Sequence, residues 1–242
     1  MATSARGAMG TAPGDLDLLA GGAITIKGRI ARSSNATFLV EVTLNDTTGL
    51  AVYKPEQGER PLWDFPPGLF KREVATYLLS ETLGWGLVPA TVEREGPLGP
   101  GSVQRFVDAD FQQHYFTLRE NPANRERLKQ ICLLDLVANN ADRKSGHCLL
   151  GRDALIYAID NALTFHAEPK LRTVIWEFSG QVIPKAMLAD VRRVLAKGLP
   201  RSLAALLDPE EQEALIARAH AVAKEGRFPA ETGGWSYPWP LV

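Results

Sequence analysis

Two aspartates near the middle of the chain are placed to carry out phosphate chemistry together. Asp142 lies in the polar segment of residues 139–147, and Asp160 follows the apolar segment of residues 154–159. Carboxylates at the two ends of a short hairpin can divide the chemistry, because one orients an attacking hydroxyl while the other holds Mg²⁺ against nucleotide phosphates. An aspartate at the end of an apolar strand loses hydration unless it meets a cation, so we predict that Asp160 is a metal ligand.

Asp142 has a plainer interpretation, because an aspartate in a polar loop is often only a turn former. Arg143, Gly146 and His147 follow it and complete the pattern of a catalytic loop. That pattern favours a catalytic role for Asp142 over a turn-forming one.

A lysine and a glutamate precede the two aspartates in an order that suits nucleotide binding. Lys54 ends a predicted strand, and Glu73 lies early in the helix predicted to follow it. The Lys54 ammonium can reach the α- and β-phosphates of a nucleotide while Glu73 pairs with it. The alternative is a solvated lysine at a strand end and a glutamate on a helix surface. The order of all four residues along the chain favours the nucleotide site.

The turn between the first two predicted strands would lie over those phosphates. It contains Ser33, Ser34 and Asn35, and residues 32–36 include no glycine. A close cradle of backbone N–H groups is therefore not expected. The serine hydroxyls and the asparagine amide can donate to phosphate oxygens instead, and the alternative is a plain polar hairpin turn.

The elements that must position these residues are mainly strands in the first half of the chain and mainly helices in the second half. Apolar or alternating segments rich in Val, Ile, Thr and Phe predict five antiparallel strands, at residues 23–30, 36–44, 49–54, 88–94 and 102–107. A helix at residues 69–83 is inserted after the third strand, with Gly84 as its left-handed C-terminal residue. Further helices are predicted after Asn121-Pro122, near Pro184, and over residues 208–226.

The predicted fold class is α+β with two lobes. Residues 1–22 are expected to be a flexible N-terminus, and residues 23–108 a strand-rich, nucleotide-binding lobe with one helix. Residues 109–242 are expected to be a mainly helical lobe that carries the catalytic and metal-binding loops.

Composition and charge exclude several classes of function. A net charge of −1 and a pI of about 6.4 give no electrostatic case for a nucleic-acid partner. No apolar run is long enough to span a bilayer, and residues 1–14 lack the apolar core of a signal peptide. Two cysteines without C-x-x-C spacing are read as reduced core thiols, so we predict a cytoplasmic protein.

Aromatic residues leave peripheral membrane contact open. They occur in the loop of residues 57–68 and in the tail, as Trp235, Tyr237 and Trp239. Such side chains can sit at a membrane interface, and the alternative is that the tail aromatics dock on the helical lobe. The oligomeric state is not indicated by the sequence.

Six short motifs in order resemble one superfamily. They are the Ser33-Ser34-Asn35 turn, the segments at residues 52–55, 72–79 and 83–91, Asn140-Ala141-Asp142-Arg143, and residues 159–165. They resemble the phosphoinositide-kinase-like branch of the protein-kinase-like superfamily, and most closely a family of compact actinobacterial proteins within it. The sequence is similar to type II phosphatidylinositol kinases in the helix-to-Val-Pro passage and the Asn-x-Asp-Arg loop. HipA-type serine kinases share the Asn-x-Asp element more loosely.

The resemblance covers about residues 24–165 and implies a two-lobed protein-kinase-like fold with ATP and Mg²⁺, or Mn²⁺, as cofactors. It implies that Lys54 and Glu73 form the nucleotide-positioning ion pair. Asp142, with Arg143 beside it, would be the catalytic acid-base, and Asp160 the metal ligand. The hinge facing adenine would be formed by Gln104, Arg105, Phe106 and Val107.

His147 departs from the pattern, because it occupies the position that usually holds a metal-binding asparagine. Imidazole suits Mg²⁺ less well than an amide oxygen does. We therefore favour a phosphate contact or support of Asp142 over a role as the second metal ligand.

The predicted function is an ATP- and Mg²⁺-dependent phosphotransferase that acts on an alcohol, either a lipid head group, a polyol or a protein serine. One alternative is a pseudokinase, an ATP-binding or scaffold module without turnover. The other is transfer of AMP with the nucleotide inverted. The sequence does not select the acceptor.

Overall fold

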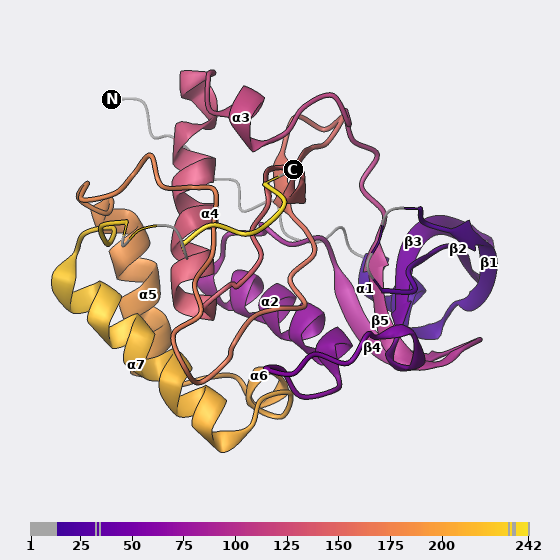
Figure 1. The fold of residues 1–242 in the computed structure, drawn as a ribbon. Helices are drawn as coiled ribbons and strands as arrows, with labels where there is room; N and C mark the ends of the chain where they lie inside the picture. The colour runs from indigo at the N-terminus through magenta and orange to yellow at the C-terminus, as the bar shows by residue number, and fades with distance from the viewer. Residues whose placement is uncertain (1–13, 32, 34, 232, 234–235, 242) are drawn as a thin grey trace, which may run out of the picture.

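The computed structural model describes residues 14–31, 33, 35–231, 233 and 236–241, which form a five-stranded sheet, a two-stranded sheet and a set of helices. The strands are β1 (Ala23–Arg29), β2 (Phe38–Leu44), β3 (Thr47–Pro55), β4 (Thr91–Gly96) and β5 (Gly99–Arg105). They are antiparallel in the order β1-β2-β3-β5-β4. Figure 1 shows the sheet at the right, α4, α5 and α7 at the left, and α2 between them. The predicted α+β class with a five-stranded antiparallel sheet is confirmed.

The alternation of strand side chains determines which residues share a face of the sheet. Val40 and Val42 of β2 are fully buried, as β-branched residues on the inner face of a strand should be. In the pairing of β3 with β5, Lys54 lies opposite Ser102 and Val52 lies opposite Gln104. Lys54 and Gln104 therefore project from the same face.

Helix α2 (Leu69–Leu83) joins the sheet to the helical part of the chain. It begins after Gly68 and ends at Gly84, both with left-handed backbone, so the predicted cap at Gly84 is confirmed. It packs against β4 and β5 on one side and against α5 and α6 on the other. A helix covered on both sides is buried around most of its circumference, which holds Glu73 in a fixed position.

The second half of the chain is mainly helical, as predicted. Its long helices are α4 (Arg125–Ala138), α5 (Lys185–Lys197) and α7 (Pro209–Glu225), and α5 and α7 lie side by side (Figure 1). The predicted capping box of α7 is present, with Asp208 as N-cap and Glu211 at the third helical position. The shorter elements are α3 (Tyr115–Leu118), α6 (Arg201–Ala204), η1 (Glu56–Gly58), η2 (Pro122–Asn124) and η3 (Ser145–His147).

A small hairpin follows η3, formed by β6 (Cys148–Leu150) and β7 (Ile156–Ala158). It separates the loop that contains Asp142 from Asp160, as the sequence pattern predicted. Cys132 and Cys148 are buried free thiols.

Several boundaries differ from prediction. Strand β4 begins at Thr91 and not at residue 88, and β5 begins at Gly99 and not at residue 102. Helix α1 (Asp15–Gly21) lies within the segment expected to be flexible, because Leu18 and Leu19 are buried against the sheet. The strand expected at residues 102–107 ends at Arg105, so Phe106 and Val107 lie beyond it. Within the described residues, no helix is sufficiently long and apolar to cross a bilayer.

Candidate active site

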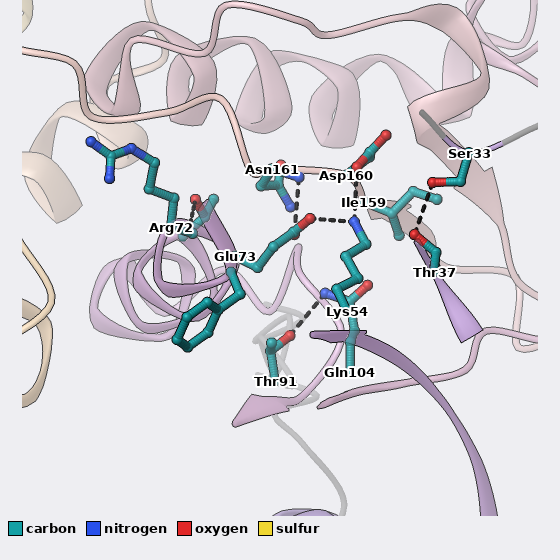
Figure 2. Close-up of polar contacts among 12 residues, drawn as sticks. Ser33, Thr37, Lys54, Arg72, Glu73, Thr91, Gln104, Ile159, Asp160 and Asn161 are labelled. Carbon is teal, nitrogen blue, oxygen red and sulfur yellow. Dashed lines mark hydrogen bonds and ion pairs between the residues drawn. The ribbon is translucent and has the colours of Figure 1, made fainter. Parts of the chain in front are cut away.

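Lys54, Glu73 and Asp160 meet at the face of the sheet that adjoins α2. The Lys54 ammonium donates to Glu73 Oε1 and, at 2.8 Å, to Asp160 Oδ1. Figure 2 shows the three side chains converging from β3, from α2 and from the segment after β7. The structure thus brings together three residues that are far apart in the sequence and that the sequence analysis assigned to one nucleotide site.

Local backbone geometry directs Asp160 into this cluster. Asp160 has a left-handed backbone with φ of 56°, which aspartate tolerates better than most residues. The following N–H, that of Asn161, donates to Glu73 Oε2 at 3.0 Å. Both oxygens of the Glu73 carboxylate are therefore held, one by Lys54 and one by the Asp160–Asn161 turn.

The charges in this cluster stabilise one another. Burial by itself would lower the pKa of Lys54, but Asp160 and Glu73 raise it well above its ordinary value. Lys54 in turn holds the pKa of Asp160 well below its usual range, against the opposing effect of burial. Asp160 is 47% exposed, so a carboxylate ionised at neutral pH faces the solvent side of the cluster. An exposed carboxylate is suited to meet a cation.

Asp142 lies in the loop that follows α4. This helix ends at Asn139, which has a left-handed backbone, and the Asn140 carboxamide oxygen then accepts a hydrogen bond from Asp142 N–H at 2.9 Å. The Asp142 carboxylate is paired with the Lys144 ammonium, Nζ to Oδ2, at 3.1 Å. Burial raises the pKa of Asp142 although Lys144 opposes the shift. A carboxylate with a raised pKa is a stronger base than an ordinary aspartate.

Arg143 does not line the site, which corrects its assignment as a catalytic residue. Its side chain is 0% exposed, and it binds Asp135 of α4 through Nε and Nη2. It also donates to the Ile159 carbonyl at 2.7 Å and to Asn161 Oδ1 at 2.6 Å. Arg143 is a positioning residue, because it ties α4 to the segment that carries Asp160.

His147 lies between the two aspartates. Its Nδ1 is 2.9 Å from the Asp142 carbonyl oxygen, and its Nε2 is 3.2 Å from Asp160 Oδ2. Burial lowers the pKa of His147 to about 4, while Asp160 opposes that shift. The imidazole is therefore neutral at physiological pH and supports the backbone of the Asp142 loop.

The predicted hinge residues occupy different surroundings from one another. Gln104 is buried and donates from Nε2 to Thr91 Oγ1 at 2.8 Å (Figure 2). Arg105 pairs with Asp15 of α1 at 3.5 Å and stacks over the Tyr157 ring. Both side chains are engaged by the protein, so recognition of a base at this hinge would depend on backbone groups.

Val107 belongs to a small apolar cluster next to this hinge. The cluster is formed by Val107, Ala109, Leu149 and Tyr157, with Leu155 and Ile159 packed against it. Phe106 N–H donates to the Leu50 carbonyl, whereas the Val107 N–H has no hydrogen-bond acceptor among the described residues. An apolar wall beside a free backbone donor is suited to a flat heteroaromatic ring.

The predicted phosphate turn is only partly described. Ser33 Oγ is 2.8 Å from Thr37 Oγ1 (Figure 2), and Ser34 lies outside the described residues. Asn35 Oδ1 accepts from Arg60 N–H at 3.0 Å, and Ala36 N–H donates to the Gly58 carbonyl. The turn is therefore attached to the segment around η1, and Asn35 keeps only its amide NH₂ to donate elsewhere.

Lys144 and the contact of the C-terminal segment with the catalytic loop were not predicted from the sequence. Lys144 follows Asp142 by two residues, and this proximity in sequence was an available signal. The segment of residues 236–241 returns to the catalytic loop, where the Leu241 carbonyl accepts from Ser145 N–H at 2.8 Å. No sequence pattern marked this contact. Of the tail aromatics, Tyr237 is half-buried, Trp239 is 86% exposed, and Trp235 lies outside the described residues.

The protein supplies few cation ligands by itself. Among the described residues, no group of three or more His, Cys, Asp and Glu side chains is placed to hold a metal ion. The arrangement fits a cation that is shared with a bound phosphate, since such cations take one or two protein ligands and complete their shell with phosphate oxygens and water.

Comparison with known proteins places this chain in a family. Protein Rv2133c of Mycobacterium tuberculosis is 38% identical over 260 aligned positions, which cover 92% of this chain and 94% of that protein. The chain belongs to the family of Rv2133c. No family model matches the sequence.

Two solved structures show what the fold is. The Golgi casein kinase with Mn/ADP bound has a TM-score of 0.56 at 16% identity, and the alignment covers 94% of this chain and 79% of that one. The structure of hydra Fam20 with sugar has a TM-score of 0.55 at 12% identity, with 87% of each chain covered. Likeness at this level of identity establishes the fold alone. The fold is protein-kinase-like, as the sequence motifs predicted.

Proposed function

We propose that this protein is an ATP- and divalent-metal-dependent phosphotransferase that transfers the γ-phosphate of ATP to an alcohol. The observation that carries the proposal is the Lys54–Glu73–Asp160 cluster, with Asp142 on a loop that is tied to the same segment. A lysine paired with a helix glutamate beside an exposed aspartate is the set of groups that phosphate positioning and metal binding require.

Each residue has a distinct proposed role. Lys54 holds the α- and β-phosphates, and Glu73 fixes the Lys54 ammonium in place. Asp160 ligates the cation, which when bound neutralises charge on the phosphates. Asp142 accepts the proton of the acceptor hydroxyl. The hydroxyl oxygen bonds to the γ-phosphorus while the bond between that phosphorus and the leaving ADP oxygen breaks.

The base is proposed to bind against the apolar cluster at Val107. The Mn/ADP complex of the Golgi casein kinase, a protein of the same fold, supports the choice of nucleotide and metal. Residues 23–108 would form the nucleotide-binding lobe and residues 109–242 the helical lobe with the catalytic loop. We place the protein in the phosphoinositide-kinase-like branch on the strength of its sequence motifs.

The acceptor is proposed to be a lipid head group, a polyol or a protein serine. Trp63 is 93% exposed on the loop before α2, and it lies near Lys170, whose ammonium is 5.5 Å from the ring centre. An exposed indole can contact a membrane surface peripherally, whereas the Lys170 ammonium is already paired with Asp64 at 3.1 Å.

The test uses ATP labelled in two positions, together with a cell extract as the source of acceptors. Transfer of label from γ-³²P-ATP, but not from α-³²P-ATP, is expected for the wild type and should be lost in Asp142→Asn. Transfer from α-³²P-ATP would identify an AMP transferase. ATP binding without transfer of either label would identify a binding module, and both results would overturn the proposal.

A further inference from the structure

An arginine from the segment after Asp160 lies alongside the catalytic loop, next to Asp142. The Arg172 N–H donates to the Asn140 carbonyl at 2.9 Å, and the Arg172 carbonyl accepts from the Arg143 N–H at 3.0 Å. Asp142 lies between the two loop residues that make these bonds. The backbone of Arg172 is therefore held about 5 Å from the catalytic loop, the spacing of paired strands.

The same pairing indicates the direction of the Arg172 side chain. Arg143 and Thr173 form a parallel bridge, and their side chains are buried, at 0% and 2% exposure. In paired extended segments, successive side chains point to opposite faces. Asp142 and Arg172 precede the two bridge partners, and both are half-buried and not enclosed. Arg172 and the proposed catalytic base thus share the outward face of this pairing.

The guanidinium of Arg172 is available for a ligand. Its side chain has no hydrogen bond, ion pair or ring contact with any residue that the structure describes. The neighbouring cations are each paired with a carboxylate: Lys54 with Glu73 and Asp160, Arg143 with Asp135, Lys144 with Asp142, and Lys170 with Asp64. Arg172 therefore places an uncompensated positive charge beside the proposed base.

The chemistry of arginine limits what this charge would bind. The planar guanidinium presents parallel N–H donors that match the two oxygens of a carboxylate or phosphate. In the proposed function, Lys54 and Asp160 serve the phosphates of the nucleotide. An anionic group at Arg172 would then belong to the other reactant, whose hydroxyl must reach Asp142.

We propose that Arg172 selects the acceptor by binding a phosphate or carboxylate group that the acceptor carries close to its reacting hydroxyl. The substrate is then a small anionic alcohol, either free or as a lipid head group. The inference rests on the proposed function and deepens it by naming the chemical class of the acceptor. Arg172 lies beyond residues 24–165, so the sequence motifs do not assign it a role.

A small acceptor fits this site better than an acidic peptide does. One free guanidinium suits one charged group near the hydroxyl. An acidic peptide would need a row of free cations along the segment, and Lys144 and Lys170 are already paired with Asp142 and Asp64.

The class of acceptor can be tested before its identity is known. A cell extract is separated into protein, aqueous and organic-solvent fractions, and the last two are passed over an anion exchanger. The material that accepts label from γ-³²P-ATP should be retained by the exchanger and released by salt. Its fraction distinguishes a free alcohol from a lipid head group. Acceptor material that is not retained, or that occurs only in the protein fraction, would overturn the inference.

Treatment of the retained material with alkaline phosphatase identifies the charged group. Loss of acceptor activity would show a phosphate monoester. Survival would show a carboxylate or a phosphate diester. Both results agree with recognition by Arg172, because all three groups present anionic oxygens to a guanidinium.

Substitution of Arg172 tests the residue itself on the retained acceptor. Arg172→Gln should raise the KM for this acceptor roughly 10- to 100-fold, the effect of losing a hydrogen bond to a charged group. Arg172→Lys keeps the charge without the planar fork and should lie between Arg172→Gln and the wild type. Arg201→Gln is the matched control, because Arg201 is exposed on α6 and should keep the wild-type KM.

The outcomes separate the two proposals. An unchanged acceptor KM in Arg172→Gln, with or without weaker ATP binding, would overturn the role of Arg172 and leave the phosphotransferase proposal in place. Absence of label transfer by the wild type to every fraction would overturn the proposed function and the inference with it. Urea unfolding of Arg172→Gln should match the wild type, so a raised KM would not be due to loss of structure.

Discussion

Arg72 of α2 and Glu211 of α7 form a buried ion pair, although they lie 139 residues apart in the sequence. Both side chains are less than 10% exposed. Figure 2 shows Arg72 and its neighbour Glu73 leaving α2 in different directions, with Glu73 pointing to Lys54. Arg72 thus anchors α2 to α7, and the next residue, Glu73, presents the carboxylate that holds Lys54.

Replacing Arg72 should lower the free energy of unfolding more than replacing an exposed arginine would. In Arg72→Met the Glu211 carboxylate stays buried without its partner, and breaking a buried pair in this way costs about 3–5 kcal/mol. Urea unfolding should show this loss, and Arg72→Met combined with Glu211→Gln should lose less than the sum of the single changes. Additive losses would contradict the pairing. Arg152→Met is the control, because its pair with Asp108 is highly exposed and should matter little.

Lys54→Met should remove the stabilisation of the protein by ATP. A ligand at a hundredfold excess over its dissociation constant stabilises the folded protein by about 2.7 kcal/mol, and Lys54 is the proposed phosphate contact. Thermal-shift measurements with ATP and Mn²⁺ or Mg²⁺ provide the check. Lys197→Met, at the exposed end of α5, should respond to ATP as the wild type does. Equal shifts in Lys54→Met and wild type would place the nucleotide elsewhere.

Asp160→Asn and Asp142→Asn should differ in what they lose. Asp160 is the proposed metal ligand, so Asp160→Asn should abolish the dependence of nucleotide affinity on the divalent ion. Asp142 faces Lys144 and the proposed acceptor, so Asp142→Asn should bind the metal–nucleotide complex normally and fail in transfer. Titration of ATP with and without the metal separates the two roles. An equal loss of metal dependence in both variants would show that the roles are misassigned.

Removing residues 236–242 should disturb the catalytic loop. The truncation removes the Leu241 carbonyl that Ser145 N–H binds and the Ser236 carbonyl that Thr173 N–H and the Trp176 indole N–H bind. Net losses of about 1 kcal/mol per hydrogen bond predict a stability decrease of roughly 3 kcal/mol, measurable by urea unfolding. Label transfer should fall while ADP affinity changes little. Leu241→Ala keeps the backbone carbonyl, so a defect as large as that of the truncation would rule out this explanation.

Neither cysteine should react with a thiol reagent in the folded protein at pH 8. Burial raises the pKa of Cys148 to about 12 and raises that of Cys132 well above its ordinary value. The reactive thiolate forms only as pH approaches the raised pKa, so an increase from pH 8 to pH 9 should leave the folded protein unreactive. Both thiols should become reactive when the protein is unfolded in guanidinium chloride. Rapid labelling of the native protein would show that one of these sites opens to solvent.

The extents of several elements could be predicted because their signals are local. Gly84 ends α2 since glycine tolerates the left-handed backbone there, and the Asp208–Glu211 capping box begins α7 through contacts within one turn. Helix α1 was missed because its seven residues carry a weak pattern. It is held in place by the burial of Leu18 and Leu19 on a sheet formed later in the chain.

The sequence by itself determined the fold class and the order of Lys54, Glu73, Asp142 and Asp160, because strand and helix patterns and short motifs are read within a few residues. Only the tertiary structure decided that Arg143 is buried against Asp135 and that the tail carbonyl of Leu241 meets the catalytic loop. It also decided that His147 faces Asp160. Each of these contacts depends on how separate elements pack together. The identity of a residue in the sequence does not reveal whether packing will bury or expose its side chain.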